Sequence, residues 1–257
     1  MGKVIFIPTD FSINAWVAIQ YAANLAIESN CKLIIIHAFK EGEKAIKEQM
    51  SGLLKQLVTE FPEIDYLTIY KKGNLNEVIS QIARKYPPKL IVMGTKGASG
   101  LKYVIVGSNT LNVVNHFNIP VLAVPKSNNF YSINKIGILS NYKNFEIDVM
   151  RKSIAVLPVI SNLTLLHVRE NENEDEETII GSWKELMKVK TGLKNIDHKI
   201  GIGSSILSVV NNMLEEEQID LLIITNNGKR FFKSLFNRDL LKAIALKPHI
   251  SILFVKP

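Results

Sequence analysis

Glycine and hydroxyl residues gather at one point of the chain where an anion could be bound. Gly94 and Gly97 follow a short apolar run, and Gly107, Ser108 and Asn109 come a little further on. Glycine lets the backbone approach a phosphate without a Cβ in the way, and free N–H groups at a helix N-terminus favour anions. The pattern predicts a phosphate-binding loop. Glycines that merely form turns are the alternative interpretation.

The sequence lacks the motifs of several other kinds of binding site and enzyme. The P-loop pattern G-x-x-x-x-G-K-[ST] and the dinucleotide pattern G-x-G-x-x-G are both absent from the chain. A G-x-S-x-G elbow is absent too, which disfavours an acyl-transfer enzyme. Cys31 is the only cysteine and has no His or basic cluster beside it in sequence, so it is predicted to be inert packing.

An internal repeat indicates which elements position the glycine loop. Apolar runs at 4–7, 32–38, 89–93 and 119–125 recur in the same order and spacing at 136–139, 163–168, 220–224 and 250–257. Short apolar runs of this kind are typical of buried parallel strands. Helical patterns lie between them at 15–28, 43–60 and 75–85, the last preceded by Asn74 as a cap.

The alternation of strands and helices predicts the fold class. Each half reads as five strands alternating with four helices, which implies parallel strands with helices on both faces of the sheet. The chain is therefore predicted to be α/β, with two tandem doubly wound domains of five parallel strands. Their boundaries are placed at 1–127 and 134–257, and the polar, turn-prone segment 127–132 is taken as the linker.

Ligands of open parallel sheets bind outside the carboxyl ends of the strands, so the loops after the strands matter most. In the first half, Pro8, Thr9 and Asp10 follow the first strand and Ala38 ends the second. Met93 ends the fourth strand, immediately before Gly94. These loops should lie together with the glycine loop.

The motif itself resembles that of a known family. Gly94-x2-Gly97-x9-Gly107-Ser108 resembles the G-x2-G-x9-G-[ST] nucleotide signature of the universal stress protein family. Residues 4–12 are similar to the family's first strand and turn, 33–38 to its second strand, and 120–124 to its last. The resemblance covers 2–126 by motif and 134–257 by architecture, and it implies an adenine nucleotide α-hydrolase-like fold.

The resemblance also implies an ATP site in the first half. Asp10 would hydrogen-bond the ribose and the Ala38 backbone would meet the adenine edge, while bracing the turn is the alternative role for Asp10. Lys96 is either a phosphate contact or a solvated lysine. Mg²⁺ or Mn²⁺ would bridge phosphate oxygens, with no metal site made by the protein alone. The full predicted set is Pro8, Thr9, Asp10, Ala38, Met93, Gly94, Lys96, Gly97, Gly107, Ser108 and Asn109.

The second half has lost most of this motif. Only Gly228 of the glycines remains, and Thr225 and Arg238 stand where the family brings bare backbone to the phosphates. ATP binding is therefore predicted for the N-terminal half alone. Since domains of this family pair through their fifth strands, 121–124 and 252–255 are predicted to form an intramolecular pseudo-dimer. A homodimer of whole chains stays open.

The leading functional hypothesis is an ATP-binding stress-response sensor or regulator. No catalytic residue is predicted, because nothing beyond Lys96 and a metal could position water and compensate charge at the γ-phosphate. A ligand-free interaction or dimerisation module and a slow ATP hydrolase are the alternatives.

Composition limits the cellular setting. Apolar runs stay well short of the ~18 residues that a membrane span needs, and no signal peptide pattern opens the chain. A single cysteine fits a reducing compartment, so a cytoplasmic location is expected. The net charge is +7 without a dense basic arm, and neither nucleic acid nor membrane is predicted as a partner.

Overall fold

The computed structural model describes residues 3–97, 104–105, 107–126, 133, 135–157, 162–171, 176–225 and 250–257. Their N-terminal half contains β1 (Val4–Pro8), α1 (Ile13–Glu28), β2 (Lys32–Phe39), α2 (Glu43–Glu60), β3 (Tyr66–Lys72), α3 (Leu75–Lys85), β4 (Leu90–Gly94), β5 (Lys96–Gly97), β6 (Val104–Ile105), α4 (Ser108–His116) and β7 (Val121–Val124). The C-terminal half contains β8 (Ile136–Leu139), α5 (Phe145–Val156), β9 (Asn162–Arg169), α6 (Glu176–Thr191), β10 (Asn195–Ile202), α7 (Ile206–Glu216), β11 (Leu221–Thr225) and β12 (Ser251–Val255).

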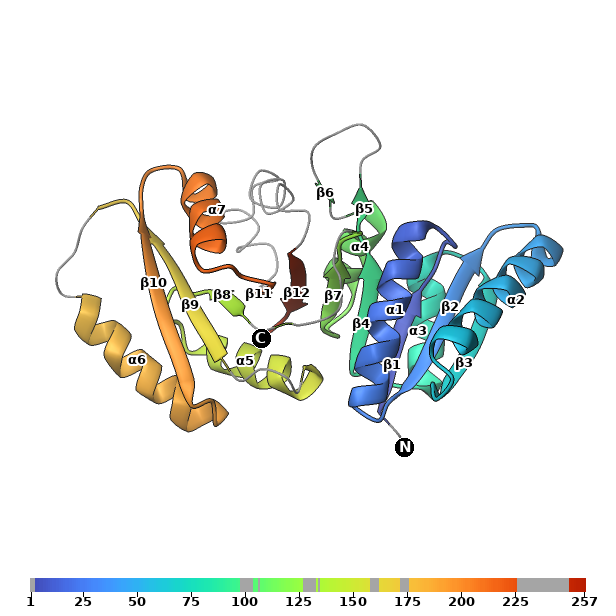
Figure 1. Ribbon diagram of the computed structural model, residues 1–257, viewed down its shortest axis with the longest axis horizontal. Coiled ribbons are helices and arrows are strands. Elements are labelled where there is room, and N and C mark those ends of the chain that lie inside the picture. The colour runs from blue at the N-terminus through green and yellow to red at the C-terminus, as the bar shows by residue number, and fades with distance from the viewer. Residues whose placement is uncertain are drawn as a thin grey trace.

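Ten of these strands form one continuous sheet in the order β10-β9-β8-β11-β12-β7-β4-β1-β2-β3. Within each half of this sheet the strand pairs are parallel, and the order of the five strands is the same in both. This confirms the predicted α/β class with two five-stranded parallel units (Figure 1). The predicted linker at 127–132 lies outside the described residues, and the boundaries 1–127 and 134–257 stay a prediction.

Local sequence explains where the helices begin. The Asn74 side chain accepts a hydrogen bond of 3.0 Å from the Glu77 N–H, so α3 begins at the predicted cap. Helix α1 begins at Ile13, earlier than the predicted 15, because the Ser12 side chain caps it by accepting from the Ala15 N–H. Helix α2 has the predicted bounds.

The helices cover the sheet on both faces. Helices α1, α2, α5 and α6 contribute to one buried apolar cluster, and α3, α4 and α7 to another on the opposite face. Each cluster contains residues from both halves, so the apolar core is continuous across the middle of the molecule. The strands are apolar on both faces because both are covered.

The two halves join through β7 and β12, at the centre of Figure 1. These strands are antiparallel, with Leu122 opposite Leu253 and Val121 opposite Phe254. Leu122 and Leu253 are equivalent residues, since they pair with the third residue of β4 and of β11 respectively. The pairing is therefore pseudo-twofold, which confirms the prediction that the fifth strands lie together.

Further contacts cross the same boundary. The Lys256 ammonium donates a hydrogen bond of 3.0 Å to the Asn115 carbonyl of α4. Burial raises the pKa of the Tyr21 hydroxyl, which lies beside Ser251 of β12. The interface therefore extends beyond the two strands into the helices on both sides.

The structure also bears on the expectations for Cys31 and for membrane-spanning segments. Cys31 is 5% exposed and its Sγ donates to the Ser29 carbonyl, which fits its predicted role in packing. Among the described helices, none has both the length and the apolar composition of a membrane-spanning segment.

The strand pairing predicts how the N-terminal half behaves alone. Residues 1–126 expressed without β12 would leave the buried apolar strand β7 with an unpaired edge, and such edges promote association. We expect this fragment to self-associate or aggregate in light scattering, whereas the full chain does not do so through this edge. A fragment that stays monomeric on dilution and concentration alike would contradict the role given to the β7–β12 pair.

Candidate functional site

A cavity of about 340 Å³ lies at the carboxyl ends of β1, β2 and β4. Its volume is in the range of small-molecule sites, roughly 300–1,000 Å³. The predicted site residues that line it are Pro8, Thr9, Asp10, Ala38, Met93, Gly94, Gly107, Ser108 and Asn109. The structure thus brings these residues together, and their role as nucleotide contacts stays a prediction.

For Lys96 and Gly97 the structure describes the backbone pairing alone. They form β5, which pairs antiparallel with β6 through Lys96–Ile105 and Gly97–Val104. A short β-ribbon, which the motif did not predict, therefore stands between Gly94 and α4. Residues 98–103 and 106 lie outside the described part of the chain.

The loop after β1 is held by a compact hydrogen-bond arrangement. His37 Nδ1 donates to the Thr9 carbonyl at 2.7 Å, and the Thr9 hydroxyl accepts from the Phe11 N–H at 3.0 Å. Phe11 has a left-handed backbone with φ of 61°, and its ring lies 4.5 Å from that of His37. His37 is therefore a backbone-bonded histidine, and it fixes the loop that carries Asp10.

Asp10 stands exposed at the rim of the cavity. Its Oδ1 accepts a hydrogen bond of 3.1 Å from the Ser12 N–H, so the turn-bracing role considered for it is present. A carboxylate has about four acceptor sites on its two oxygens, and this one contact leaves room for a ligand. The two roles of Asp10 are compatible.

Two helix N-termini open onto the cavity. Ser12 and Asn14 at the start of α1 line it, as do Gly107 and Ser108 at the start of α4. Neither helix has an acidic residue in its first turn, and Gly107 gives α4 no side-chain cap. The start of α4 is therefore left with neither a side-chain cap nor an acidic residue in its first turn, which favours an anionic ligand there.

Thr95 adds a polar group that the motif did not reveal. It is 3% exposed, it lines the cavity, and among the described residues its hydroxyl has no hydrogen-bond partner. A buried hydroxyl without a partner costs roughly 1–3 kcal/mol, so a ligand oxygen at this position would relieve an existing penalty. Thr95 occupies a variable position of the motif, which explains why sequence reasoning missed it.

The cavity also extends past the predicted residues toward β3. Its lining on that side includes Phe39, Lys40, Gly73, Asn74 and Leu75. Asn74 was predicted only as the cap of α3, because nothing in its own segment points to a ligand. The residues converge there since the carboxyl ends of β2 and β3 are adjacent in the sheet.

Gly94 is needed for packing in addition to any ligand contact. A Cβ at this position would lie 2.5 Å from the carbonyl oxygen of Asn14 and 3.2 Å from the backbone nitrogen of Ala15. The first turn of α1 therefore packs directly against the end of β4. This close approach keeps the N-terminus of α1 beside the cavity.

The loop after β8 in the C-terminal half has the same hydrogen-bond arrangement as the loop after β1. His167 Nδ1 donates to the Ser140 carbonyl at 2.8 Å, the Ser140 hydroxyl accepts from the Tyr142 N–H, and Tyr142 has φ of 57°. Ser140 and Tyr142 are thus the counterparts of Thr9 and Phe11. His167 is backbone-bonded like His37.

A buried carboxylate distinguishes this second loop. Glu146, at the position of Ala15 in the first half, is 2% exposed. It accepts from the Ser140 hydroxyl at 2.5 Å and from the Asn141 N–H at 2.8 Å. Thr225 stands where the first half has Gly94, since each is the last residue of its strand and pairs with Val255 or Val124. The backbone groups of this loop therefore bind a side chain of the chain itself.

Burial and hydrogen bonding act in opposite directions on Glu146. Burial, the larger effect, raises the pKa of its carboxyl above the ordinary value of 4.5. Hydrogen bonds from Ser140, Asn141 and Lys143, and the nearby His167, offset part of this rise.

Among the described residues, no group of three or more His, Cys, Asp or Glu side chains is arranged to hold a metal ion.

The chain is similar to known proteins in sequence and in fold. Residues 1–125 match the sequence model of the universal stress protein family. A universal stress protein of Methanocaldococcus jannaschii is 28% identical over 159 residues, covering 50% of this chain and 98% of that protein. A solved universal stress protein of Archaeoglobus fulgidus DSM 4304 matches 98% of both chains with a TM-score of 0.71 at 14% identity, which concerns the fold alone. Another, solved in complex with cAMP, covers 49% of this chain and 98% of that one at 23% identity, with a TM-score of 0.41.

Glu146 predicts a pH dependence of stability. Because its pKa is raised in the folded protein, unfolding releases a proton at pH values between 4.5 and the raised pKa. The free energy of unfolding should therefore fall as pH rises through this window. Glu146→Gln removes that titration, so its stability relative to wild type should improve from pH 4 to 7 in denaturant unfolding.

Glu48→Gln on the exposed side of α2 is the matched control, and it should show no such trend. A constant difference between Glu146→Gln and wild type across this pH range would mean that the buried carboxyl does not titrate with folding.

Proposed function

We propose that the N-terminal half of this chain, which belongs to the universal stress protein family, binds ATP in the cavity at the ends of β1, β2 and β4. The whole chain would then act as a stress-response sensor or regulator that responds to the bound nucleotide. The observation that carries the proposal is the convergence, in one cavity, of the motif residues, the uncapped N-terminus of α4 and the Thr95 hydroxyl, which has no partner among the described residues. Together these groups suit a polar ligand with phosphates.

The cavity offers distinct surroundings for the parts of a nucleotide. The backbone of Ala38, with Phe39 beside it, suits the adenine edge, and Asp10 at the rim suits the ribose hydroxyls. The N-terminus of α4, from Gly107 to Asn109, suits the phosphates, and Thr95 supplies a buried hydroxyl nearby. These assignments are the ones that the family resemblance implies, and the groups in each part of the cavity are chemically suited to them.

A divalent cation fits this arrangement as a companion of the phosphates. Mg²⁺ usually keeps several waters and is bound through substrate phosphates and only one or two protein oxygens. The hydroxyl groups of Thr95 and Ser108 are among the protein oxygens that line the cavity near the start of α4. Mg²⁺ or Mn²⁺ would neutralise phosphate charge there.

The C-terminal half is proposed not to bind ATP. Glu146 already accepts the hydrogen bonds of the loop after β8, and a nucleotide there would face a buried carboxylate. Thr225 also brings a side chain to the position of Gly94. This half contributes the β12 edge that completes the sheet beside the N-terminal site.

Titration calorimetry with MgATP on the whole chain tests the proposal. We expect one ATP per chain, and no detectable binding in Gly107→Val. The backbone at Gly107, with φ of −60° and ψ of 152°, is one that valine adopts readily. The loss would therefore come from side-chain volume at the N-terminus of α4, with the melting temperature little changed.

Two equivalent sites per chain, or full binding by Gly107→Val, would contradict the assignment to the N-terminal half. Absence of heat with ATP, AMP and cAMP alike would instead favour a ligand-free interaction module. Phosphate release measured over hours with the same protein would show whether bound ATP is also hydrolysed slowly.

Thr95 permits a sharper test with a matched control in the other half. Thr95→Val keeps the shape but removes the buried hydroxyl, and it should weaken ATP binding about tenfold, the size of one lost hydrogen bond. The same change should leave the free protein as stable or more stable, because the hydroxyl has no described partner to lose. Thr225→Val removes an equally buried, unpartnered hydroxyl from the C-terminal half and should leave ATP affinity unchanged.

Equal effects of the two variants on ATP affinity would mean that Thr95 acts through general stability and not through the ligand. Destabilisation of the free protein by Thr95→Val would show that its hydroxyl already has a partner.

A further inference from the structure

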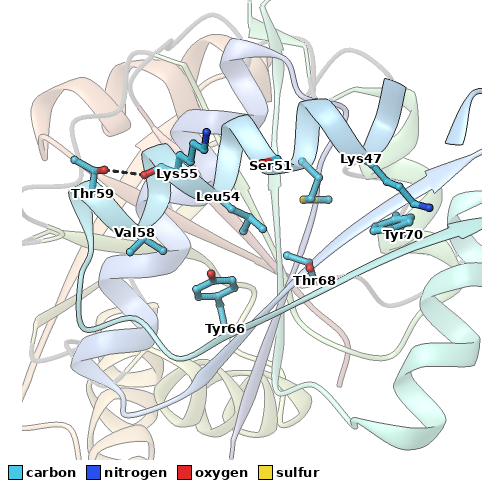
Figure 2. Close-up of a pocket in the computed structure, with 10 residues that line it drawn as sticks. Lys47, Ser51, Leu54, Lys55, Val58, Thr59, Tyr66, Thr68 and Tyr70 are labelled. Carbon is cyan, nitrogen blue, oxygen red and sulfur yellow. Dashed lines mark hydrogen bonds between the residues drawn. The ribbon is translucent and has the colours of Figure 1, made fainter. Parts of the chain in front are cut away.

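A second hollow lies between α2 and the edge strand β3, and it shares no described lining residue with the cavity at the ends of β1, β2 and β4. It is an open groove of about 760 Å³. Figure 2 shows Tyr66, Thr68 and Tyr70 of β3 along one side and Leu54 and Val58 of α2 along the other. The side chains are alternate residues of the strand, so they share one face of the sheet.

Strand β3 ends the ten-stranded sheet, and within the described residues it pairs only with β2. The Asp65 carbonyl and the Gly73 N–H both bond to β2, at Leu33 and Phe39 respectively. In a parallel ladder, successive residues point their backbone groups to opposite sides. Tyr66, Thr68 and Tyr70 therefore direct their N–H and C=O groups toward the free edge.

The groove and the free edge form one surface with a definite charge. Lys47 and Lys55 line the groove, and no Asp or Glu is among its described lining residues. Lys71 and Lys72 are exposed at the end of the same strand. Glu43 neutralises only Lys47, at 2.9 Å. A strand added here would find backbone partners at its side, apolar contacts above it and positive charge around it.

We propose that β3 and α2 form a docking site for an extended acidic peptide segment of a partner protein. The segment adds a strand to β3 through the backbone of Tyr66, Thr68 and Tyr70. Its alternate apolar side chains enter the groove beside Leu54 and Val58, and its acidic side chains contact the lysines. A second copy of this chain fits less well, because edge-to-edge pairing of two β3 strands brings the two sets of lysines together.

The probe for this site is a blocked hexapeptide of alternating glutamate and valine, labelled for fluorescence anisotropy. The control peptide has lysine in place of glutamate. We expect saturable binding of the acidic peptide to the whole chain with Kd below about 1 mM, and at least about tenfold weaker binding of the basic one. Hydrogen exchange should slow at the Thr68 and Tyr70 amides and stay unchanged at Leu67 and Ile69, which already face β2.

Two variants separate the backbone and charge contributions. Thr68→Pro removes an N–H that points to the free edge but none that bonds to β2, and it should abolish binding. Lys55→Glu should weaken binding about tenfold, as for the loss of a charge-assisted contact. Lys44→Glu, the same change at an exposed position of α2 outside the groove lining, is the control and should have a much smaller effect.

Three results would overturn the proposal: no saturable binding of the acidic peptide, equal binding of both peptides, or equal effects of Lys55→Glu and Lys44→Glu. Self-association of the whole chain that Thr68→Pro removes would assign the edge to a second copy. Should Thr68→Pro fail to fold, the two lysine variants and the exchange pattern still decide the outcome. Thr68, Lys55 and Lys44 are not among the described residues that line the proposed nucleotide cavity, so ATP binding is an independent measurement.

Discussion

The antiparallel pairing of β7 with β12 is the interaction on which the rest of the molecule depends. Each half, taken alone, ends in a buried apolar strand with one unpaired edge, and Leu122 opposite Leu253 closes both edges at once. On each face of the sheet, the pairing also joins apolar residues of the two halves into one continuous cluster. Because equivalent residues face each other, the interface has the self-complementary character of a twofold dimer, built within one chain.

The two halves have the same fold, and they differ at positions that shape the surroundings of the loop after the first strand. Both loops after the first strand have a histidine bonded to a backbone carbonyl and an aromatic residue with positive φ. The difference arises at Ala15 and Gly94, which become Glu146 and Thr225. In the first half the small residues let α1 pack closely on β4 and leave a cavity. In the second, the buried carboxylate takes up the loop's hydrogen-bond donors.

Much of the fold could be predicted because its signals are local. Short apolar runs locate strands, and Asn74 locates a helix start since its side chain satisfies a backbone N–H that the helix cannot. Most of the site was predictable as well, because loops after parallel strands must meet at one edge of the sheet. Thr95, Glu146 and the β5–β6 ribbon were not. An unpartnered hydroxyl, a carboxylate that folds back onto its own loop and a two-residue strand all depend on tertiary geometry, and none has a sequence period.

The two outer edges of the sheet show why charge matters as much as shape for a docking surface. Both β3 and β10 are terminal strands, and lysines are a common means of discouraging unwanted pairing at such edges. On β10, Lys199 is bound by Glu216 at 2.8 Å and lies 3.8 Å from Glu217, so its charge is compensated within the chain. Beside β3 the lysines are Lys47 and Lys55 of α2 and Lys71 and Lys72 at the strand end. Among the described residues, only Lys47 of these four has an acidic partner. An acidic strand would gain charge contacts at β3 that β10 does not offer, and a neutral or basic strand would be discouraged at β3 by the same lysines.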